Sequence, residues 1–573
     1  MLISKKIIIV WIFLSSLTSY TVKARVLHVS QNQLSEIDSQ VQLRSIGEAA
    51  ALLQAGDTLI IHNGIYRERI NIDKDGTSEK PIVISAATGE YVVVTGADRL
   101  TQWQKEDGQD NIFSTDWPYK FITWTKYHSH PDDDYHRLIG RCEQVFINGY
   151  PLRQVLKYDQ LSRGTFCVDL LQRQLYIWNA NNADIGSGKE MVEASVRDHI
   201  WKCRGRYIVT KGIRFKYAAN RAQNGAVLIN GDHNTVEDCI FEYTNASGAQ
   251  FTGKNIVVRN CIFQNNGQLG FSANRAHGLF MSGCTIRNNN IKGFDRGWEA
   301  GGNKIVLTRN AIIENSIFIE NKGDGIWFDI GNENNEVRNC LIAYNENAGI
   351  FYEISYGLYA HDNVIVGNGF AHSPGEWGAS SGISLSSSPN CIVERNLILG
   401  NKEGFNFREQ IRKTPRINGN SETVWNHDQI IRHNVLAYNR DAQLWGWFDV
   451  QDQRHWPRSM QSKPKNDLSK STYDPVKKLT LADLRLQISG NIYWAAPGQG
   501  FINWGVPWRM YKKYKRLEDV QSELSLTRSD KREEVLVKSY FSLDLRVPTE
   551  CVVLHNNCYP RGKVPGVTLG TYE

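Results

Sequence analysis

A short phrase recurs along the middle of the chain and sets the length of its structural unit. It reads x-N-x-(I/V/L)-(I/F/L), then a polar turn, a Gly and a short alternating stretch. Successive copies are separated by 22, 29, 26, 24, 23, 33 and 38 residues, so the basic unit has about 22–24 residues with insertions in some copies. The anchor positions of these copies are Cys239, Cys261, Asn290, Ser316, Cys340, Asn363, Asn396 and Asn434. A repeat of this length indicates a solenoid in which each copy forms one coil.

The residues of each copy favour strands over helices. Helical solenoids need units of more than about 30 residues with a 3.6-residue period, whereas these stretches are short, β-branched and alternate with a period of two. Of the 47 Asn residues, 34 lie between positions 201 and 440, which suggests an inward ladder in which each amide bonds to the next coil. We therefore expect an all-β fold, a right-handed parallel β-helix with stacked Ile, Val, Leu and Phe in its core.

Composition and spacing divide the rest of the chain. Residues 1–24 combine a basic start, an apolar run of 11 residues and a cleavage motif ending at Ala24, which is typical of a signal peptide and predicts a periplasmic or secreted protein. Residues 25–95 should form an N-terminal cap, with a helix over 45–57, and the first coils. Residues 96–205 predict a β-rich insertion domain, residues 206–440 the main β-helix, and residues 441–573 the C-terminal coils and loops, with a short helix over 516–525.

Charge and cysteine usage narrow the class of protein. The net charge of +6 is too small for a protein that coats nucleic acid, and 11% aromatic residues are too many for a disordered chain. We expect no nucleic-acid partner, and no membrane association once the signal peptide is removed. Several of the ten Cys occupy anchor positions and should be small buried side chains, which leaves a disulfide between Cys551 and Cys558 open. No Cys/His spacing suggests zinc.

Acidic side chains recur on the outward face of one predicted sheet. Each strand starts at a Gly, and Trp327 and Asp329 in GDGIWFDI then point outward. Phe351 and Glu353 hold the matching places 24 residues later, and Glu299 lies 30 residues before Asp329 with a different offset from its Gly. The predicted outward column is Asn274, Glu299, Asp329, Glu353, Ser386 and Arg408.

Three like charges stacked about 4.8 Å apart destabilise a sheet, so this column calls for a function. A solvated face and a calcium site are two interpretations, and catalysis without a metal is the third. Two carboxylates about 5–5.5 Å apart suit a retaining glycosidase. Asp329 is then the nucleophile, and Glu353 or Glu299 is the acid/base, kept protonated by the charge of Asp329. The expected substrate contacts are Trp327, Phe351, Asn274, Ser386 and Arg408.

This layout resembles glycoside hydrolase family 120, which contains retaining β-xylosidases. The resemblance rests on Asp329 in IWFDI, Glu353 in FYEIS and Glu299 in GWEAGG, within an exported β-helix that a β-rich insertion interrupts. It is specific over residues 299–357 and implies that Asp329 is the nucleophile, Glu353 the acid/base and Glu299 a competing or assisting acid. Family 141, whose members include α-L-fucosidases, is similar in layout and leaves the sugar open.

Other residues can line the same groove. The segment 128–136 is rich in His and Asp, and His372 and Glu376 lie in an insertion that follows the Glu353 coil. Six tryptophans, of which Trp298 is expected to point inward, lie in or near the groove: Trp298, Trp327, Trp377, Trp445, Trp447 and Trp456.

The sequence thus favours a glycosidase acting on plant or algal polysaccharides, and two other functions stay open. A polysaccharide lyase needs a Lys or Arg base, and the predicted column offers only Arg408. The third function is a non-catalytic carbohydrate-binding β-helix. Three stacked acids count against it, because their repulsion destabilises the sheet without a catalytic benefit.

Overall fold

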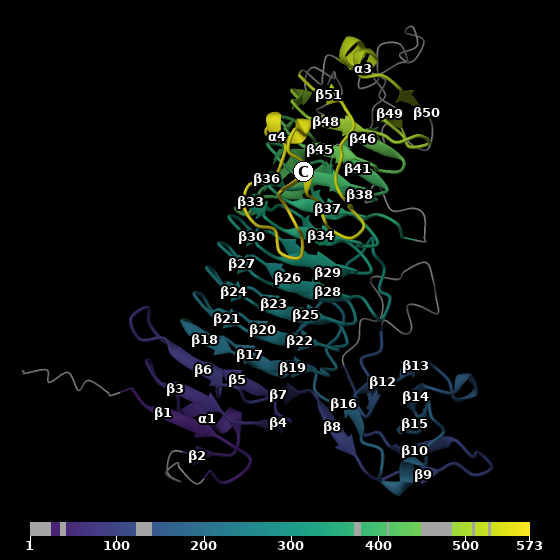
Figure 1. Cartoon of the computed structure of the whole chain (residues 1–573). Coiled ribbons are helices and arrows are strands. Elements are labelled where there is room, and N and C mark those ends of the chain that lie inside the picture. Colours follow the sequence, from purple (N-terminus) through teal and green to yellow (C-terminus); the bar gives the residue numbers. More distant parts are fainter. Residues whose placement is uncertain are drawn as a thin grey trace, which may run out of the picture.

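The computed structural model describes residues 24–34, 42–121, 140–371, 380–409, 412–448, 484–506, 510–524 and 529–573, without the side chains of residues 409, 447, 448, 506 and 510. Three long sheets run along the chain, and all their strands pair in parallel except the last two of one sheet. Successive coils stack on one another into a long column (Figure 1). The predicted parallel β-helix is confirmed.

Sheet A has 14 strands from β2 (Gln42–Leu43) to β47 (Gln487–Ser489), and sheet B has 13 from β4 (Gly64–Tyr66) to β51 (Lys531–Arg532). Sheet C, which carries the acidic column, has 13 strands. In order they are β5 (Ile70–Ile72), β17 (Trp201–Cys203), β20 (Gly225–Ile229), β23 (Ser247–Phe251), β26 (Leu269–Asn274), β29 (Gly301–Val306), β32 (Ile326–Asp329), β35 (Ile350–Glu353), β38 (Ser381–Ser386), β41 (Glu403–Glu409), β46 (Ala442–Phe448), β49 (Ile502–Val506) and β50 (Met510–Tyr514).

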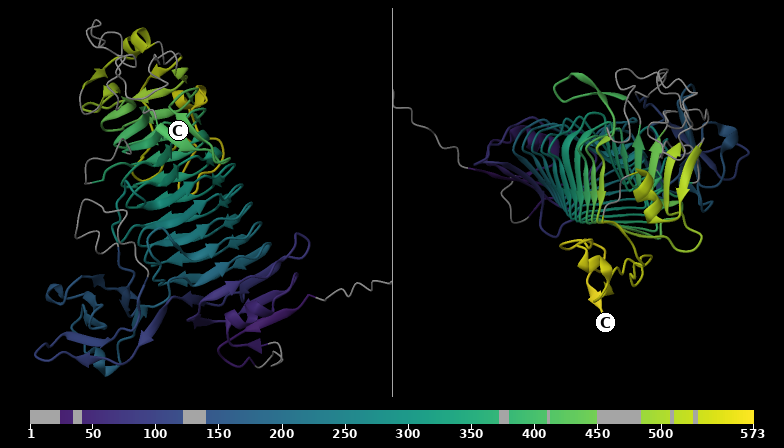
Figure 2. Two further views of the ribbon diagram at one scale, coloured as in Figure 1. Left: turned by 180° about the vertical axis from the view of Figure 1, so that it is seen from behind. Right: turned by 90° about the horizontal axis from the view of Figure 1, so that it is seen from above.

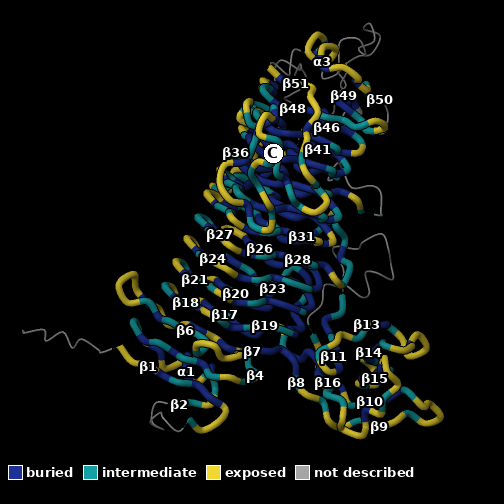
Figure 3. The backbone as a smooth tube through the Cα atoms, in the orientation of Figure 1, coloured by how far each residue is buried: buried dark blue, intermediate teal, exposed yellow. Residues whose placement is uncertain are grey.

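One coil illustrates how the repeat builds the core. It consists of β30 (Ile312–Glu314), β31 (Ile317–Ile319) and β32, one strand for each sheet. Ile313, Phe318 and Phe328 point inward and are completely buried. Asn315, between β30 and β31, has φ 48°, a left-handed conformation that Asn tolerates well and that turns the chain through the corner. Figure 3 shows the buried residues running along the strands of the coils.

Two inward ladders of Asn side chains tie successive coils together, as the Asn excess predicted. In the first ladder, Nδ2 of Asn363 donates to Oδ1 of Asn396 at 2.9 Å, and the pattern continues through Asn434 to Asn491. The second ladder was not predicted and is longer. It contains Asn266, Asn289, Asn321, Asn345, Asn368, Asn401 and Asn439, joined by Nδ2 to Oδ1 distances of 2.9–3.0 Å.

One anchor of the predicted repeat is wrong. Cys284, directly before β28 (Thr285–Arg287), holds the place assigned to Asn290, because β28 pairs in register with the strand that follows Cys261. Asn290 lies in the next loop, where its amide donates to the carbonyl of Phe294 at 2.9 Å. Cys239, Cys261, Cys284 and Cys340 are all buried, as expected for small substitutes in this column.

The first coil is covered by α1 (Ile46–Leu52), the helix expected over residues 45–57. Ser45 is its N-cap and accepts a hydrogen bond from the amide of Glu48. The carboxylate of Glu68, and not that of Glu48, bonds to the Ser45 hydroxyl and the first amides of the helix, so a residue from a later turn completes the cap.

Among the described residues, nine strands, β8 (Ala97–Leu100) to β16 (Val192–Ser195), lie between β7 (Val92–Thr95) and β17 and leave the column of coils. They form a four-stranded and a five-stranded sheet beside the first coils (Figure 1). Phe113, Phe166 and Ile177 belong to a hydrophobic cluster of their own, so this β-rich part has a separate core.

The C-terminal segment folds back on the outer face of sheet B, where the view from above places it outside the coils (Figure 2). Val535, Leu545 and Val553 pack there against outward residues of sheet B. Cys551 and Cys558 are both free thiols in this segment, so the disulfide between them is not formed. The predicted short helix is α3 (Leu517–Leu524), and α4 (Val552–His555) follows near the end.

No helix of the described part of the chain is long and apolar enough to cross a membrane. The expected signal peptide lies almost entirely outside the described residues.

Candidate active site

The register of sheet C aligns most of the predicted outward column. Glu353 pairs with Ser386, and Ser386 pairs with Arg408. Phe328 pairs with Tyr352, which puts Asp329 beside Glu353 on the next strand. Asp329 and Glu353 therefore belong to neighbouring coils, with strands about 4.8 Å apart.

Glu299 does not belong to this column. Val306 is the register neighbour of both Asp329 and Asn274, so the predicted alignment of Glu299 is wrong. The loop before β29 contains Glu299 and adds residues that a fixed spacing cannot foresee. Glu299 still lies close to the other acids, buried, with its Oε2 accepting a hydrogen bond of 2.6 Å from Nε2 of Gln223.

Lys304 is the cation at the centre of the acidic cluster, and no feature of the repeat predicted it. It extends outward from β29, and its Nζ lies 3.0 Å from Oδ2 of Asp329 and 4.0 Å from the centre of the Trp327 ring. Nζ also donates to the carbonyl of Trp298 at 2.9 Å. Burial lowers the pKa of Lys304, but the charges of Asp329, Glu299 and Glu353 outweigh burial and raise it, so the ammonium stays charged.

Asp329 is a buried carboxylate with a perturbed pKa. Burial raises the pKa, the ammonium of Lys304 lowers it and the charge of Glu353 raises it, with a net value of about 6. The raised pKa thus falls on the residue expected to be the nucleophile. Lys304 occupies Oδ2, whereas Oδ1 is buried and has no hydrogen-bond partner in the structure.

Glu353 is held by Arg412, whose Nη1 donates to Oε1 of the carboxylate. Arg412 belongs to β42 (Arg412–Pro415), which pairs with β43 (Ser421–Val424) in a hairpin outside the coils. Arg416, farther along the hairpin, is 2.7 Å from Glu333 and stacks over Tyr356. The hairpin thereby brings a cation to the acidic face from a part of the chain that no repeat predicts.

Asp324 is a fourth buried acid near this cluster. One of its oxygens accepts a hydrogen bond of 3.0 Å from the amide of Ala348, and the other has no hydrogen-bond partner in the structure. Burial, helped by the charge of Glu353, raises the pKa of Asp324 well above the usual range. In the sequence Asp324 looks like an ordinary Asp-Gly turn before a strand.

The predicted substrate contacts differ in their exposure. Trp327 and Phe351 stack with ring centres 5.6 Å apart and are nearly buried, beside the two acids. Ser386 is fully buried with an unpartnered hydroxyl, and Arg408 is 2% exposed, so neither offers an open surface. Asn274 is exposed two strands from Asp329.

The other candidates contribute less to this site. Trp298 packs against Ala222, Phe294 and Ala300 outside the coils, so the expectation that it points inward is wrong. Trp445 lies four strands from Trp327 on the same face. Several candidates lie outside the described residues or side chains: the 128–136 segment, His372, Glu376, Trp377, Trp447 and Trp456.

Calcium was one interpretation of the acids. Within the described ranges, no group of three or more His, Cys, Asp or Glu side chains is arranged to hold a metal ion. Asp329, Glu299 and Glu353 instead interact with the ammonium of Lys304, which supplies positive charge to the cluster.

Comparison with known families and structures agrees with this fold. A family model described as right handed beta helix region matches residues 224–375, and one described as Chondroitinase B matches residues 42–106. No curated protein matches the chain by sequence.

Several solved structures are similar. XylC in complex with xylose is 18% identical, with 82% of this chain and 83% of XylC covered and a TM-score of 0.62. A glycoside hydrolase is 14% identical, with 67% and 94% covered and a TM-score of 0.49, and pectate lyase Pel9A is 16% identical, with 65% and 79% covered and a TM-score of 0.34. The expected resemblance to a β-helix glycoside hydrolase is confirmed as a similarity of fold: the chain is a right-handed parallel β-helix like that of XylC.

Proposed function

We propose that the protein is an exported glycoside hydrolase that cleaves glycans derived from plant or algal polysaccharides with retention of configuration. The observation that carries this proposal is the pair Asp329 and Glu353, in register on neighbouring strands, each joined to its own cation. The strand spacing of about 4.8 Å is close to the 5–5.5 Å that separates the two carboxyls of retaining enzymes.

In this mechanism Asp329 is the nucleophile. Lys304 neutralises part of its charge through Oδ2 and leaves Oδ1 to attack the anomeric carbon. The bond to the leaving oxygen breaks as that oxygen takes a proton from the acid/base, and a glycosyl ester forms on Asp329. Water then attacks the anomeric carbon and gives its proton to the same acid/base, the bond from that carbon to the Asp329 oxygen breaks, and the sugar leaves with its original configuration.

Glu353 is our choice for the acid/base because it is the register neighbour of Asp329. Glu299 reaches the same cluster from its loop, and its hydrogen bond from Gln223 suits a residue that orients a sugar hydroxyl or Lys304. Arg412 fixes the Glu353 carboxylate through Oε1. When the leaving group binds, the Arg412 side chain must either move away or keep Oε1 while the other carboxylate oxygen acts on the leaving group.

A lyase would use a neutral Lys or an Arg as base. The acids around Lys304 raise its pKa, which keeps it protonated and unsuited to remove a proton. The similarity in fold to a xylose-bound protein makes β-xylosides the first substrates to test, followed by α-fucosides.

The test is a screen of aryl glycosides with the wild-type protein, Asp329→Asn and the control Glu314→Gln. Glu314 is an ion-paired carboxylate of the same coil, on sheet A and remote from the site. We expect turnover of at least one substrate by wild type and control, and loss of at least about a thousandfold in Asp329→Asn. Equal turnover in all three would refute the proposal, and ultraviolet-absorbing unsaturated products from a uronate polymer would identify a lyase.

A further inference from the structure

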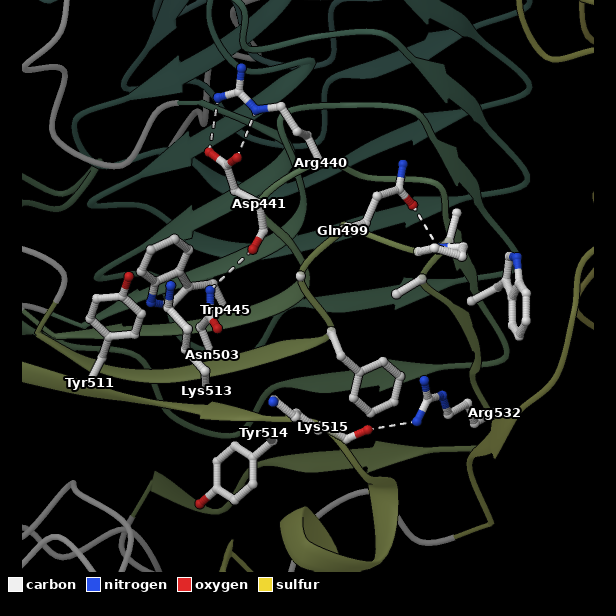
Figure 4. Close-up of a pocket in the computed structure, with 17 residues that line it drawn as sticks. Arg440, Asp441, Trp445, Gln499, Asn503, Tyr511, Lys513, Tyr514, Lys515 and Arg532 are labelled. Carbon is white, nitrogen blue, oxygen red and sulfur yellow. Dashed lines mark hydrogen bonds and ion pairs between the residues drawn. The ribbon is translucent and has the colours of Figure 1, made fainter.

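A concave site lies at the C-terminal end of sheet C, away from Asp329. Its volume is about 870 Å³, within the range of small-molecule sites, and we call it the C-terminal pocket. Six of the side chains that line it carry the argument: Arg440, Trp445, Tyr511, Lys513, Lys515 and Arg532. They come from β46, from β50, from β51 and from the segments beside these strands (Figure 4).

Aromatic rings form one wall of the C-terminal pocket. Trp445 and Tyr511 lie with ring centres 5.1 Å apart and are drawn side by side in Figure 4. Trp494 and Phe501 also line the cavity. Such rings offer flat apolar surfaces that suit the C–H faces of sugar rings.

The other feature of the pocket is an excess of positive charge. Four cations and one carboxylate line it, and the carboxylate, Asp441, is bound by Arg440 at 2.7 and 3.1 Å. Arg532 stacks 4.7 Å from the centre of the Phe501 ring. No carboxylate of the described residues forms an ion pair with Lys513 or Lys515, and both side chains are exposed.

The alternation of β50 separates two groups of side chains. Lys512 and Tyr514 contact Glu523 of α3 and hold that helix. Tyr511, Lys513 and Lys515 occupy the alternate positions, so their side chains share the opposite face. Lys512 is thus paired with Glu523, whereas Lys513, whose Nζ lies 5.5 Å from the centre of the Tyr511 ring, and Lys515 form no ion pair with a described carboxylate.

We propose that the C-terminal pocket binds an acidic oligosaccharide, with a sugar ring against Trp445 and Tyr511 and its carboxylate or sulfate ester held by Lys513 and Lys515. Charge-assisted hydrogen bonds from ammonium groups suit either anion. Trp445 is four strands from Trp327 along one outward column, which is about 19 Å at 4.8 Å a step. The binding itself does not rest on the proposed function.

Titration calorimetry on the full-length protein tests this proposal with three probes: oligogalacturonate, a sulfated galactan oligosaccharide and neutral xylohexaose. We expect one or both acidic probes to bind, and the two acidic arms distinguish a carboxylate from a sulfate ester. Added NaCl should weaken the binding, because exposed charges are screened. Binding of xylohexaose should be at least tenfold weaker.

The double variant Lys513→Gln/Lys515→Gln should weaken binding of the acidic probe by about tenfold or more. Both lysines are exposed, so the fold should survive, which an unchanged melting temperature would verify. Lys531→Gln, an exposed lysine of β51 paired with Glu533, is the control and should bind as wild type does. Absence of binding to both acidic probes, equal affinity for xylohexaose, or an unchanged affinity in the double variant would overturn the proposal.

Discussion

Replacement of Lys304 by Met should move the pH dependence of the proposed glycoside hydrolysis in a defined direction. Met keeps the apolar stem against Trp327 and removes the ammonium that lies 3.0 Å from Oδ2 of Asp329. Without this charge, burial and Glu353 both act to raise the pKa of Asp329 further above its present value of about 6. An opposite charge at this range lowers a carboxyl pKa by roughly 1–3.

The magnitude follows from the ionised fraction of Asp329. With a pKa of about 6, about nine-tenths of the protein has Asp329 ionised at pH 7. If the pKa rises by about 2, the fraction falls to about one-tenth. We expect kcat/KM at pH 7 to fall by about tenfold or more and the acidic limb of its pH profile to move up by roughly one to three pH units.

The assay is kcat/KM for an aryl glycoside from pH 4 to 10, with Lys254→Met as an exposed control. Loss of a buried ion pair also costs about 3–5 kcal/mol of stability, so rates are compared well below the melting temperature. An acidic limb that stays where wild type has it would refute the role assigned to Lys304. So would equal activity of the variant and wild type at pH 7.

Three further predictions concern the scaffold. Burial raises the pKa of Glu403 to about 7 from an ordinary 4.5, so the folded protein binds a proton that the unfolded chain releases, and stability falls as pH rises through this interval. Glu403→Gln should therefore be more stable than wild type by roughly 3 kcal/mol at pH 8 and equal near pH 4 in urea unfolding; equal stability at both would contradict this. Asn345→Ala removes four hydrogen bonds of the second ladder and should cost roughly 3–5 kcal/mol, against less than about 1 for the exposed Asn418→Ala. All ten Cys should react with iodoacetamide in denaturant without a reductant, and a mass showing eight modified Cys would reveal a disulfide.

The repeat made most of the fold predictable. A period near 23 residues with alternating apolar positions allows only a coil of short strands, and the Gly before each strand fixed the outward places of Asp329 and Glu353. The predicted alignment of residues between coils failed where a loop changes the number of residues in a coil. The loop before β29 displaced Glu299 from the column, and Cys284 replaced Asn290 for the same reason.

The cations of the site could not be found by periodicity. Lys304 lies two residues before the position that pairs with Asp329, in a strand whose register was misjudged. Arg412 reaches Glu353 from a hairpin outside the repeat. The raised pKa of Asp324 follows from burial, which a turn sequence does not disclose. A pair of buried carboxylates requires cations nearby, because unpaired buried charges are strongly destabilising.

The most direct measurement is the location of the covalent intermediate. A 2-deoxy-2-fluoro glycoside with an activated leaving group, of the sugar found by the aryl glycoside screen, should accumulate a glycosyl-enzyme, because the fluorine slows its hydrolysis. Peptide mass spectrometry should then find one sugar on Asp329. A sugar on Glu353 or Glu299, or no covalent adduct together with product of inverted configuration, would contradict the account of this site.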